Sequence, residues 1–181
     1  VFGVEGLKNI DVDRFSLRAL SIILGGGMSS RLFQEIREKK GLCYSIFSFT
    51  QMQNYSGVFG FYAGTSPKNV DYLLESSLTE MKKIKKFISV EELNRAKAQM
   101  KSSFIMGHES NSSRSEYFAK NMINFGKIIG ADEVIASIEK ISINSIHDLC
   151  DKLLTSANPV LSVIGPDANS LKKLDISTML N

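Results

Sequence analysis

The spacing of apolar residues predicts a strand and then a helix at the start of the chain. Residues 1–6 read as a strand, after which Asp11 or Asp13 can cap a helix. The apolar positions of this helix recur at helical spacing, at Phe15, Ala19, Ile22 and Ile23. We expect the helix to stop at Gly25–Gly27, where three residues without a Cβ have the greatest backbone freedom.

A short helix is predicted directly after the glycine run. Ser29 or Ser30 can cap it, and Gly41 stands where a left-handed residue commonly ends a helix. The residues expected to face inward are Leu32, Phe33 and Ile36.

Two strand-like runs follow, at residues 42–53 and 58–64. The turn residues between them, 54–57, favour an antiparallel hairpin. In the second run, one face carries Phe59, Phe61 and Ala63, which we expect to be the core side.

The rest of the sequence is predicted to be mostly helical. Helix starts are indicated at Ser66, Ser89, Asp132 and Ser142. A further helix, which carries Tyr117, Phe118 and Met122, is expected to end at Gly126. A last strand is expected between Pro159 and Pro166, followed by a polar, frayed tail. Strands at both ends with helices between them predict an α+β domain over residues 1–181, with one mostly antiparallel sheet covered by helices.

Composition narrows the class of protein. The 181 residues are 43% hydrophobic and include 11 Phe, which excludes a disordered chain. No apolar run approaches the ~20 residues of a membrane-spanning helix, so no membrane span is expected. The net charge of +3 is too small to indicate nucleic-acid binding. Two cysteines, Cys43 and Cys150, are too few for a disulfide framework, which favours the cytoplasm or another reducing compartment.

The two histidines do not form a metal motif. His108–Glu109 begins like a zinc-binding helix, but the position four residues after His108 is Ser112, so the second imidazole is missing. His147 has no Cys or acidic cluster at ligand spacing. We expect each histidine to have a surface or capping role, and no residue of this chain to bind a metal.

The glycine run has a structural and a functional interpretation. Glycine-rich segments before helices often cradle phosphates, but this one lacks the lysine of a phosphate loop and follows a helix rather than a strand. A nucleotide-binding module is therefore the least favoured alternative. A flexible connector between helices is favoured, and its functional variant is a mobile loop that contacts substrate.

Arg37 and Tyr44 are candidates for chemistry because a sharp helix-to-strand turn would bring them to one edge. An arginine fork binds carbonyls or carboxylates, and a tyrosine hydroxyl can donate to a developing oxyanion. The spacing alone also allows a solvated arginine and a packed tyrosine.

Residues 24–45, Leu-Gly-Gly-Gly-Met-Ser-Ser-Arg-Leu-Phe-Gln-Glu-Ile-Arg-Glu-Lys-Lys-Gly-Leu-Cys-Tyr-Ser, resemble the signature of the C-terminal half of the M16 zinc peptidases. This group includes pitrilysin, insulin-degrading enzyme and the mitochondrial processing peptidase, and the closest likeness is to the bacterial processing-peptidase branch. The resemblance continues in order along the chain, through residues 57–67, 92–97, 109–114 and 163–166.

The resemblance implies a particular division of labour. Enzymes of this group have two α+β halves that close over a peptide, and the N-terminal half carries zinc on an inverted His-x-x-Glu-His motif. The C-terminal half supplies an Arg and a Tyr, which fall on Arg37 and Tyr44. Arg37 is then expected to hold the substrate backbone, Tyr44 to stabilise the oxyanion, and Gly25, Gly26 and Gly27 to border the substrate chamber.

The His-x-x-Glu-His motif is absent from this chain. The resemblance therefore implies the substrate-binding half of a zinc metalloendopeptidase, inactive alone because zinc belongs to the other half. A strand that starts at Val1 without a Met fits a fragment that lacks this upstream half. The expected partners are a peptide, a zinc-bearing half on the same parent chain or on a partner subunit, and, as a homodimer, a second copy. The alternative is a non-catalytic pairing subunit, like the respiratory-complex core subunits that resemble these peptidases.

Overall fold

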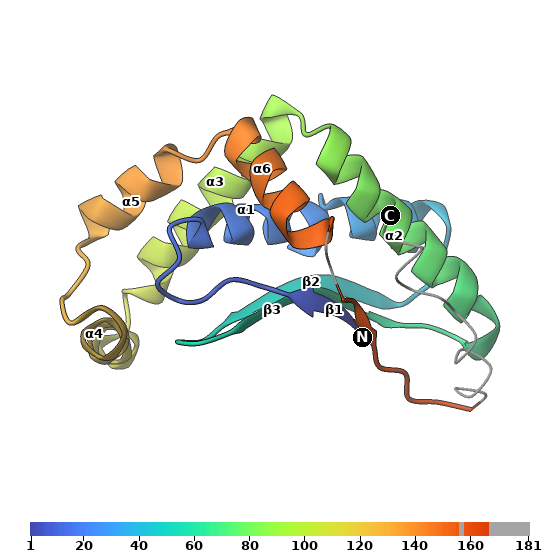
Figure 1. Ribbon diagram of the computed structural model, residues 1–181, viewed down its shortest axis with the longest axis horizontal. Coiled ribbons are helices and arrows are strands. Elements are labelled where there is room, and N and C mark those ends of the chain that lie inside the picture. The colour runs from blue at the N-terminus through green and yellow to red at the C-terminus, as the bar shows by residue number, and fades with distance from the viewer. Residues whose placement is uncertain (156–157, 167–181) are drawn as a thin grey trace.

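Helices cover one face of a sheet in the computed structural model, which describes residues 1–155 and 158–166 (Figure 1). In the described part, four strands form the sheet in the order β2-β3-β1-β4, and every pair is antiparallel. The strands are β1 (Phe2–Glu5), β2 (Ser45–Met52), β3 (Gly57–Gly64) and β4 (Val160–Leu161). The predicted α+β class with an antiparallel, helix-covered sheet is confirmed.

Side chains alternate between the two faces of the sheet, as a strand requires. Phe2 and Phe61 stack at 5.2 Å between ring centroids on the face that the helices cover, and both are buried. On the opposite face Phe47 and Tyr62 stack at 5.1 Å, and both remain exposed. The predicted hairpin is confirmed, and so is its core side, because Phe59 and Phe61 are buried.

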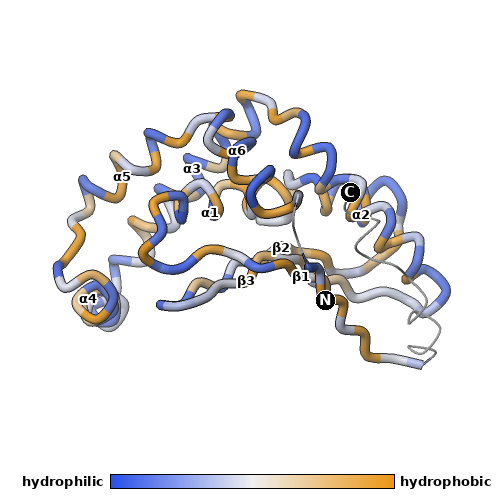
Figure 2. The backbone as a smooth tube through the Cα atoms, in the orientation of Figure 1, coloured by the Kyte–Doolittle hydropathy of each residue, from blue (hydrophilic) through white to orange (hydrophobic). Residues whose placement is uncertain are grey.

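The helical elements follow the predicted order. They are α1 (Arg14–Gly25), η1 (Phe33–Lys39), η2 (Pro67–Asn69), α2 (Val70–Lys86), α3 (Val90–Gly107), α4 (Asn111–Phe125), α5 (Ala131–Glu139) and α6 (Ile143–Leu154). Apolar and polar residues alternate along their turns (Figure 2), which is the pattern of helices that pack by one side. No helix in the described residues is long and apolar enough to cross a bilayer.

Local capping signals identified several helix ends, but not all of them. The predicted cap of the short helix is wrong, because Ser30 Oγ donates to the Gly27 carbonyl and η1 has no side-chain cap. Asp13 is the N-cap residue of α1 but forms no side-chain capping hydrogen bond. The capping box of α3 is complete: the Glu92 amide donates to Ser89 Oγ at 3.1 Å, and the Ser89 amide donates to Glu92 Oε2 at 2.8 Å. Gly41 and Gly126 have φ angles of 61° and 67°, the left-handed conformation expected after a helix.

The packing of α1 differs from the predicted stripe. Its most buried residues include Leu17, Leu20 and Leu24, whereas Phe15 and Ile22 are only half-buried. The helix lies between β2 and the helices α3 and α6, so more than one of its faces is covered. A pattern that assumes a single buried face therefore misplaces the centre of the core.

One further expectation is corrected at the end of the chain. β4 is only two residues long, because Val160 and Leu161 alone pair with β1, so the strand predicted between Pro159 and Pro166 was too long. The predicted frayed tail, residues 167–181, lies outside the described residues.

Candidate functional site

The glycine run is packed at one end and open at the other. Gly25 is the last residue of α1, and a Cβ there would lie 2.4 Å from the Ser48 amide nitrogen of β2. A Cβ on Gly26 would lie 2.5 Å from Ile22 Cα, whereas one on Gly27 would meet nothing within 4 Å. The flexible-connector interpretation is therefore wrong for Gly25, which is a buried helical residue that lets α1 rest on β2.

Arg31 ties three elements together. Its Nε and Nη2 donate to the two carboxylate oxygens of Glu92, at 2.6 and 2.8 Å, and Nη2 also donates to the Phe87 carbonyl at 2.8 Å. The Arg31 and Glu92 side chains are only 13% and 17% exposed. Burial by itself raises the pKa of the Glu92 carboxyl, but the hydrogen bonds from Arg31 and from the Ser89 amide outweigh it and lower the pKa. Arg31 thus has a structural role, which could not be predicted from the residues around it.

Arg37 lies in a π-helical stretch and remains available. The predicted short helix adopts π geometry over Phe33–Lys39, a rare form that often occurs at functional sites. The Arg37 guanidinium carbon is 4.5 Å from the centre of the Phe33 ring, and its Nε is 3.9 Å from Glu38 Oε1. The side chain is 40% exposed, and among the described residues nothing accepts a hydrogen bond from its guanidinium. Phe33 therefore steadies the guanidinium without occupying its donors.

A tight turn joins Arg37 to Tyr44, as predicted. The Gly41 amide donates to the Arg37 carbonyl at 3.2 Å, and the Leu42 amide donates to the Ile36 carbonyl at 3.0 Å. The Tyr44 amide then donates to the Gly64 carbonyl at 3.2 Å, which fixes the chain at the entrance of β2. The Tyr44 side chain is 92% exposed, and its hydroxyl has no hydrogen-bond partner in the described part of the chain. Arg37 and Tyr44 thus stand on either side of one turn with their donors free.

In the described part of the chain, β2 is an outer strand of the sheet with one unpaired edge. The Gln53 amide donates to the Ser56 carbonyl at 2.9 Å, so these two residues form a hydrogen-bonded pair. From there, non-hydrogen-bonded and hydrogen-bonded pairs alternate along the register of β2 and β3. The backbone groups of Ile46, Ser48, Thr50 and Met52 therefore turn away from β3. No strand within residues 1–155 and 158–166 pairs with them. Such an edge can add an extended peptide as a further strand.

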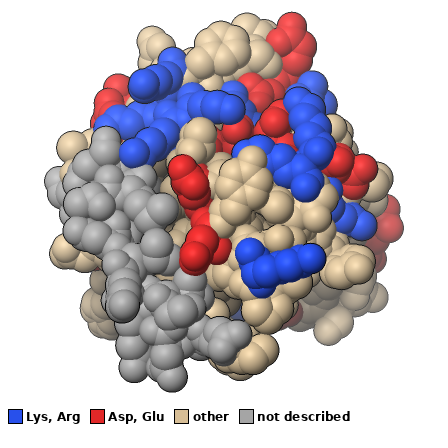
Figure 3. Space-filling view, turned by 90° about the vertical axis from the view of Figure 1, so that its right-hand side faces the viewer, with Lys and Arg blue, Asp and Glu red and all other residues tan. Residues whose placement is uncertain are grey.

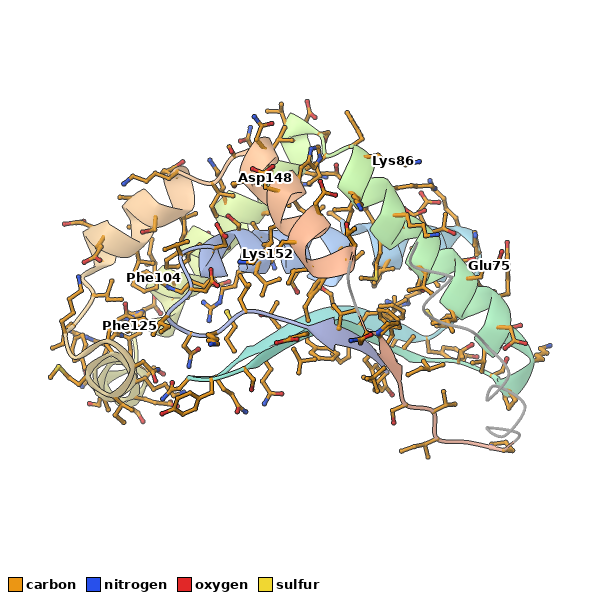
Figure 4. All side chains as sticks on the ribbon, viewed as in Figure 1. Glu75, Lys86, Phe104, Phe125, Asp148 and Lys152 are labelled. Atoms are coloured by element: carbon orange, nitrogen blue, oxygen red, sulfur yellow. The ribbon has the colours of Figure 1, made fainter. Side chains whose placement is uncertain are left out.

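A cavity of about 670 Å³ lies beside this edge, bounded by α1, α3, α4 and β2. Its apolar lining includes Phe15, Met100 and Phe104, and Figure 4 labels Phe104 near the end of the molecule where α4 lies. Arg18 of α1 and Thr50 of β2 also line it. Arg18 was not among the residues predicted from the sequence. The one sign of it in the sequence is a charged residue in the middle of a helix whose other residues are mostly buried.

The two histidines share one feature: the Nε2 atom of each is buried and has no hydrogen-bond partner in the described part of the chain. His108 follows α3 as its C-cap residue, and its Nδ1 donates to the Phe104 carbonyl at 2.7 Å, so the capping role is confirmed. His147 is half-buried in the middle of α6 and therefore caps no helix. Among the described residues, no three His, Cys, Asp or Glu side chains lie together as a metal site would require. The donor set of this part of the chain does not fit zinc.

The cysteines are structural. Cys150 is buried in α6, as predicted, and burial, with a smaller effect from Asp151, raises the pKa of its thiol to about 12. Burial also raises the pKa of the Cys43 thiol. Thiols held protonated in this way are poor nucleophiles, so neither is a candidate for covalent catalysis.

Basic side chains gather on one end of the molecule. Figure 3 looks at the end on the right of Figure 1 and shows several Lys and Arg residues near its top, with acidic residues between them. Lys83 and Lys85, in the last turn of α2, pair with Glu80 and Asp151 at 2.7 and 3.1 Å. Cations near a helix C-terminus also stabilise the helix dipole, so this charge supports α2 and needs no ligand to explain it.

These observations define an α+β domain with a helix-covered antiparallel sheet, a free edge strand, and an Arg and a Tyr open to solvent at the entrance of that strand. The family model described as the peptidase M16 inactive domain matches residues 2–100. The chain belongs to the M16 peptidase family, in which it corresponds to this inactive-type domain.

Relatives and solved structures agree with that assignment. The chain is 38% identical over 168 residues to an uncharacterized zinc protease of Rickettsia felis, covering 92% of this chain and 40% of the relative. It is 33% identical to the uncharacterized zinc protease YmxG of Bacillus subtilis, covering 91% of this chain and 41% of the relative. The chain thus spans about two fifths of these relatives.

Among solved structures, a protease from Helicobacter pylori superimposes with a TM-score of 0.77 at 27% identity, covering 84% of this chain and 37% of that one. A chain of complex III2 from Candida albicans gives a TM-score of 0.79 at 20% identity, covering 88% of this chain and 40% of that one. The second likeness shows the fold alone.

Proposed function

We propose that this chain is the substrate-binding half of a zinc metalloendopeptidase of the processing-peptidase type. The observation that carries the proposal is that Arg37 and Tyr44 lie on either side of one turn and that neither guanidinium nor hydroxyl donates a hydrogen bond to another described residue. Arg31, in the same segment, instead donates to both carboxylate oxygens of Glu92.

The two side chains have distinct tasks in this proposal. The Arg37 guanidinium donates to backbone carbonyls of the bound peptide and fixes its position. The Tyr44 hydroxyl donates to the oxyanion that develops on the scissile carbonyl, where a positioned donor lowers the barrier. In this proposal zinc is held by the other half, as the family resemblance implies, and the similarity to relatives named zinc proteases supports zinc in the parent enzyme.

The free edge of β2 supports peptide binding. An extended peptide can pair with the outward backbone groups of Ile46, Ser48, Thr50 and Met52. Gly25 lets α1 pack closely against β2, Gly26 leaves room for the backbone of Ile22 in its own helix, and Gly27 has open space around its Cα. The glycine run then borders the substrate chamber without contributing side chains.

The proposal is tested by measuring peptide hydrolysis by this chain alone, by its zinc-bearing half alone, and by the two together. We expect hydrolysis only from the combination, whether the halves share one chain or come from two subunits. Arg37→Ala in the combination should raise KM, and Lys39→Ala, which removes a neighbouring charge in the same helix, is the matched control. A combination that binds zinc and assembles but never cleaves a peptide would support a non-catalytic pairing subunit instead.

A further inference from the structure

The cavity beside β2 contains a cation that the fold does not use. Its volume of about 670 Å³ lies within the usual range of ligand pockets. Arg18 lines this cavity from α1, and in the described residues its guanidinium takes part in no salt bridge or hydrogen bond. The residue as a whole is exposed, and partial burial lowers the pKa of the guanidinium. A cation in the wall of a cavity gains more from an anionic partner than one in bulk water does, because the surrounding protein lowers the effective dielectric constant.

A second positive charge on α1, that of Arg14, lies close to Arg18. Arg14 lies one turn before Arg18, and its guanidinium carbon is 4.6 and 5.2 Å from the centres of the Phe15 and Phe125 rings. Arg14 donates to the Asp11 carbonyl at 3.1 Å and, in the described part of the chain, pairs with no carboxylate. Its charge is the second cause, after burial, of the lowered pKa of Arg18.

The other polar residues of the cavity do not compensate Arg18. Glu116 is the acidic residue in the lining, and it already forms an ion pair with Lys120 on the same helix. His108 directs Nδ1 to the Phe104 carbonyl, and its ring packs 4.5 Å from that of Tyr117. The lining thus combines apolar and hydroxyl side chains, and among the described residues Arg18 is the cation of this lining that has no carboxylate partner.

We propose that Arg18 binds a carboxylate of a peptide that lies along the free edge of β2, which makes Arg18 a specificity-determining residue. This inference rests on the proposed function, since it takes the ligand to be an extended peptide. Alternate side chains of such a strand point to the same side, so those on the cavity side reach the groove that Thr50 and Arg18 share. A planar guanidinium matches a carboxylate with two parallel hydrogen bonds. The apolar lining accommodates the stem of the acidic residue or its neighbours.

The inference is tested with the complete protein, zinc-bearing half included, and short fluorescein-labelled peptides. Each peptide carries a single Glu at a different position and has a partner with Gln at that position. Equilibrium affinities are measured by fluorescence polarisation. We expect one position at which Glu binds about 10-fold or more tightly than Gln, the usual strength of a hydrogen bond to a charged group. Arg18→Gln should abolish that ratio.

Arg14→Gln is the matched control. Arg14 lies one helical turn before Arg18 and does not line the cavity, so the change removes a positive charge nearby and leaves the cavity lining as it is. It should keep the Glu-to-Gln ratio within about twofold of the native value. A second arm compares peptides that end in a free carboxylate with the same peptides ending in an amide. A ratio that depends on the C-terminal group and on Arg18 assigns the carboxylate to the peptide terminus, and a ratio that depends on internal Glu assigns it to a side chain.

The inference is overturned if Arg18→Gln leaves every ratio unchanged, if no position prefers Glu and no terminus prefers the free acid, or if no peptide of the series binds. Polarisation does not depend on cleavage, so the proposed function is judged separately, by hydrolysis of unfolded casein. Binding that depends on Arg18 without hydrolysis would refute the proposed function and keep the inference. Hydrolysis with no effect of Arg18 would do the reverse.

Discussion

Arg31 and Arg37 lie in one short segment and have opposite environments. Arg31 is nearly buried and donates to both carboxylate oxygens of Glu92, while Arg37 is 40% exposed, stacks on Phe33 and lies 3.9 Å from Glu38 without a hydrogen bond. The same contrast separates Gly25, which is packed against β2, from Gly27, which faces open space. The first part of the segment is therefore anchored in the fold, and the last part presents free donors. A resemblance that spans the whole segment thus combines structural residues with residues available for a substrate.

The largest difference in stability is expected between substitutions of the two arginines. Arg31→Ala leaves the Glu92 carboxylate poorly solvated and unpaired, which should lower the free energy of unfolding by about 3 kcal/mol. Arg37→Ala should change it by less than about 0.5 kcal/mol, as for most surface substitutions. Urea-induced unfolding followed by circular dichroism measures both values. If both variants lost the same free energy of unfolding, the distinction between a structural Arg31 and an available Arg37 would be wrong.

A smaller difference is expected within the glycine run. Gly25→Ala places a Cβ 2.4 Å from the Ser48 amide nitrogen, so α1 or β2 must shift, at a cost of about 1–3 kcal/mol. Gly27→Ala, the control, meets no atom within 4 Å and should be tolerated. Thermal unfolding of the two variants checks this. If Gly27→Ala were the more damaging change, the packed and open ends of the run would be wrongly assigned.

The smallest expected effect is on acid stability. The pKa of Glu92 is lower in the folded chain than the value near 4.3 of an unfolded glutamate. The stability that this shift contributes is present above the unfolded pKa and is lost as the pH falls through the folded one. Glu92→Gln should therefore lose less stability than the native chain over that interval, measured by urea unfolding at successive pH values. A parallel pH dependence in the two proteins would show that the ion pair with Arg31 does not set it.

Features that depend on neighbouring residues could be predicted from the sequence. The capping box of Ser89 and Glu92 lies within four consecutive residues, and the left-handed Gly41 follows directly from the end of its helix. The hairpin of β2 and β3 likewise needs only its turn and the alternation of its strands. In each case the energy that selects the structure is local.

Features that depend on distant partners could not be predicted in this way. Nothing near Arg31 reveals that its carboxylate partner lies 61 residues further along the chain, so it could not be told apart from Arg37. The cavity that Arg18 lines needs α3 and α4 to be placed beside α1. The π geometry of Phe33–Lys39 also escapes, because its residues suit an ordinary helix equally well. The positions of Arg37 and Tyr44 came from the family resemblance, and the structure adds that both are exposed.

The most direct test of the proposed function is to measure kcat of the complete peptidase that carries Tyr44→Phe in this half. This change removes one hydroxyl from a side chain that is 92% exposed, so folding and zinc content should not change. Loss of an oxyanion donor should lower kcat by about 100-fold or more and leave KM nearly unchanged. A kcat equal to that of the native enzyme, measured on the same peptide, would contradict the role assigned to Tyr44.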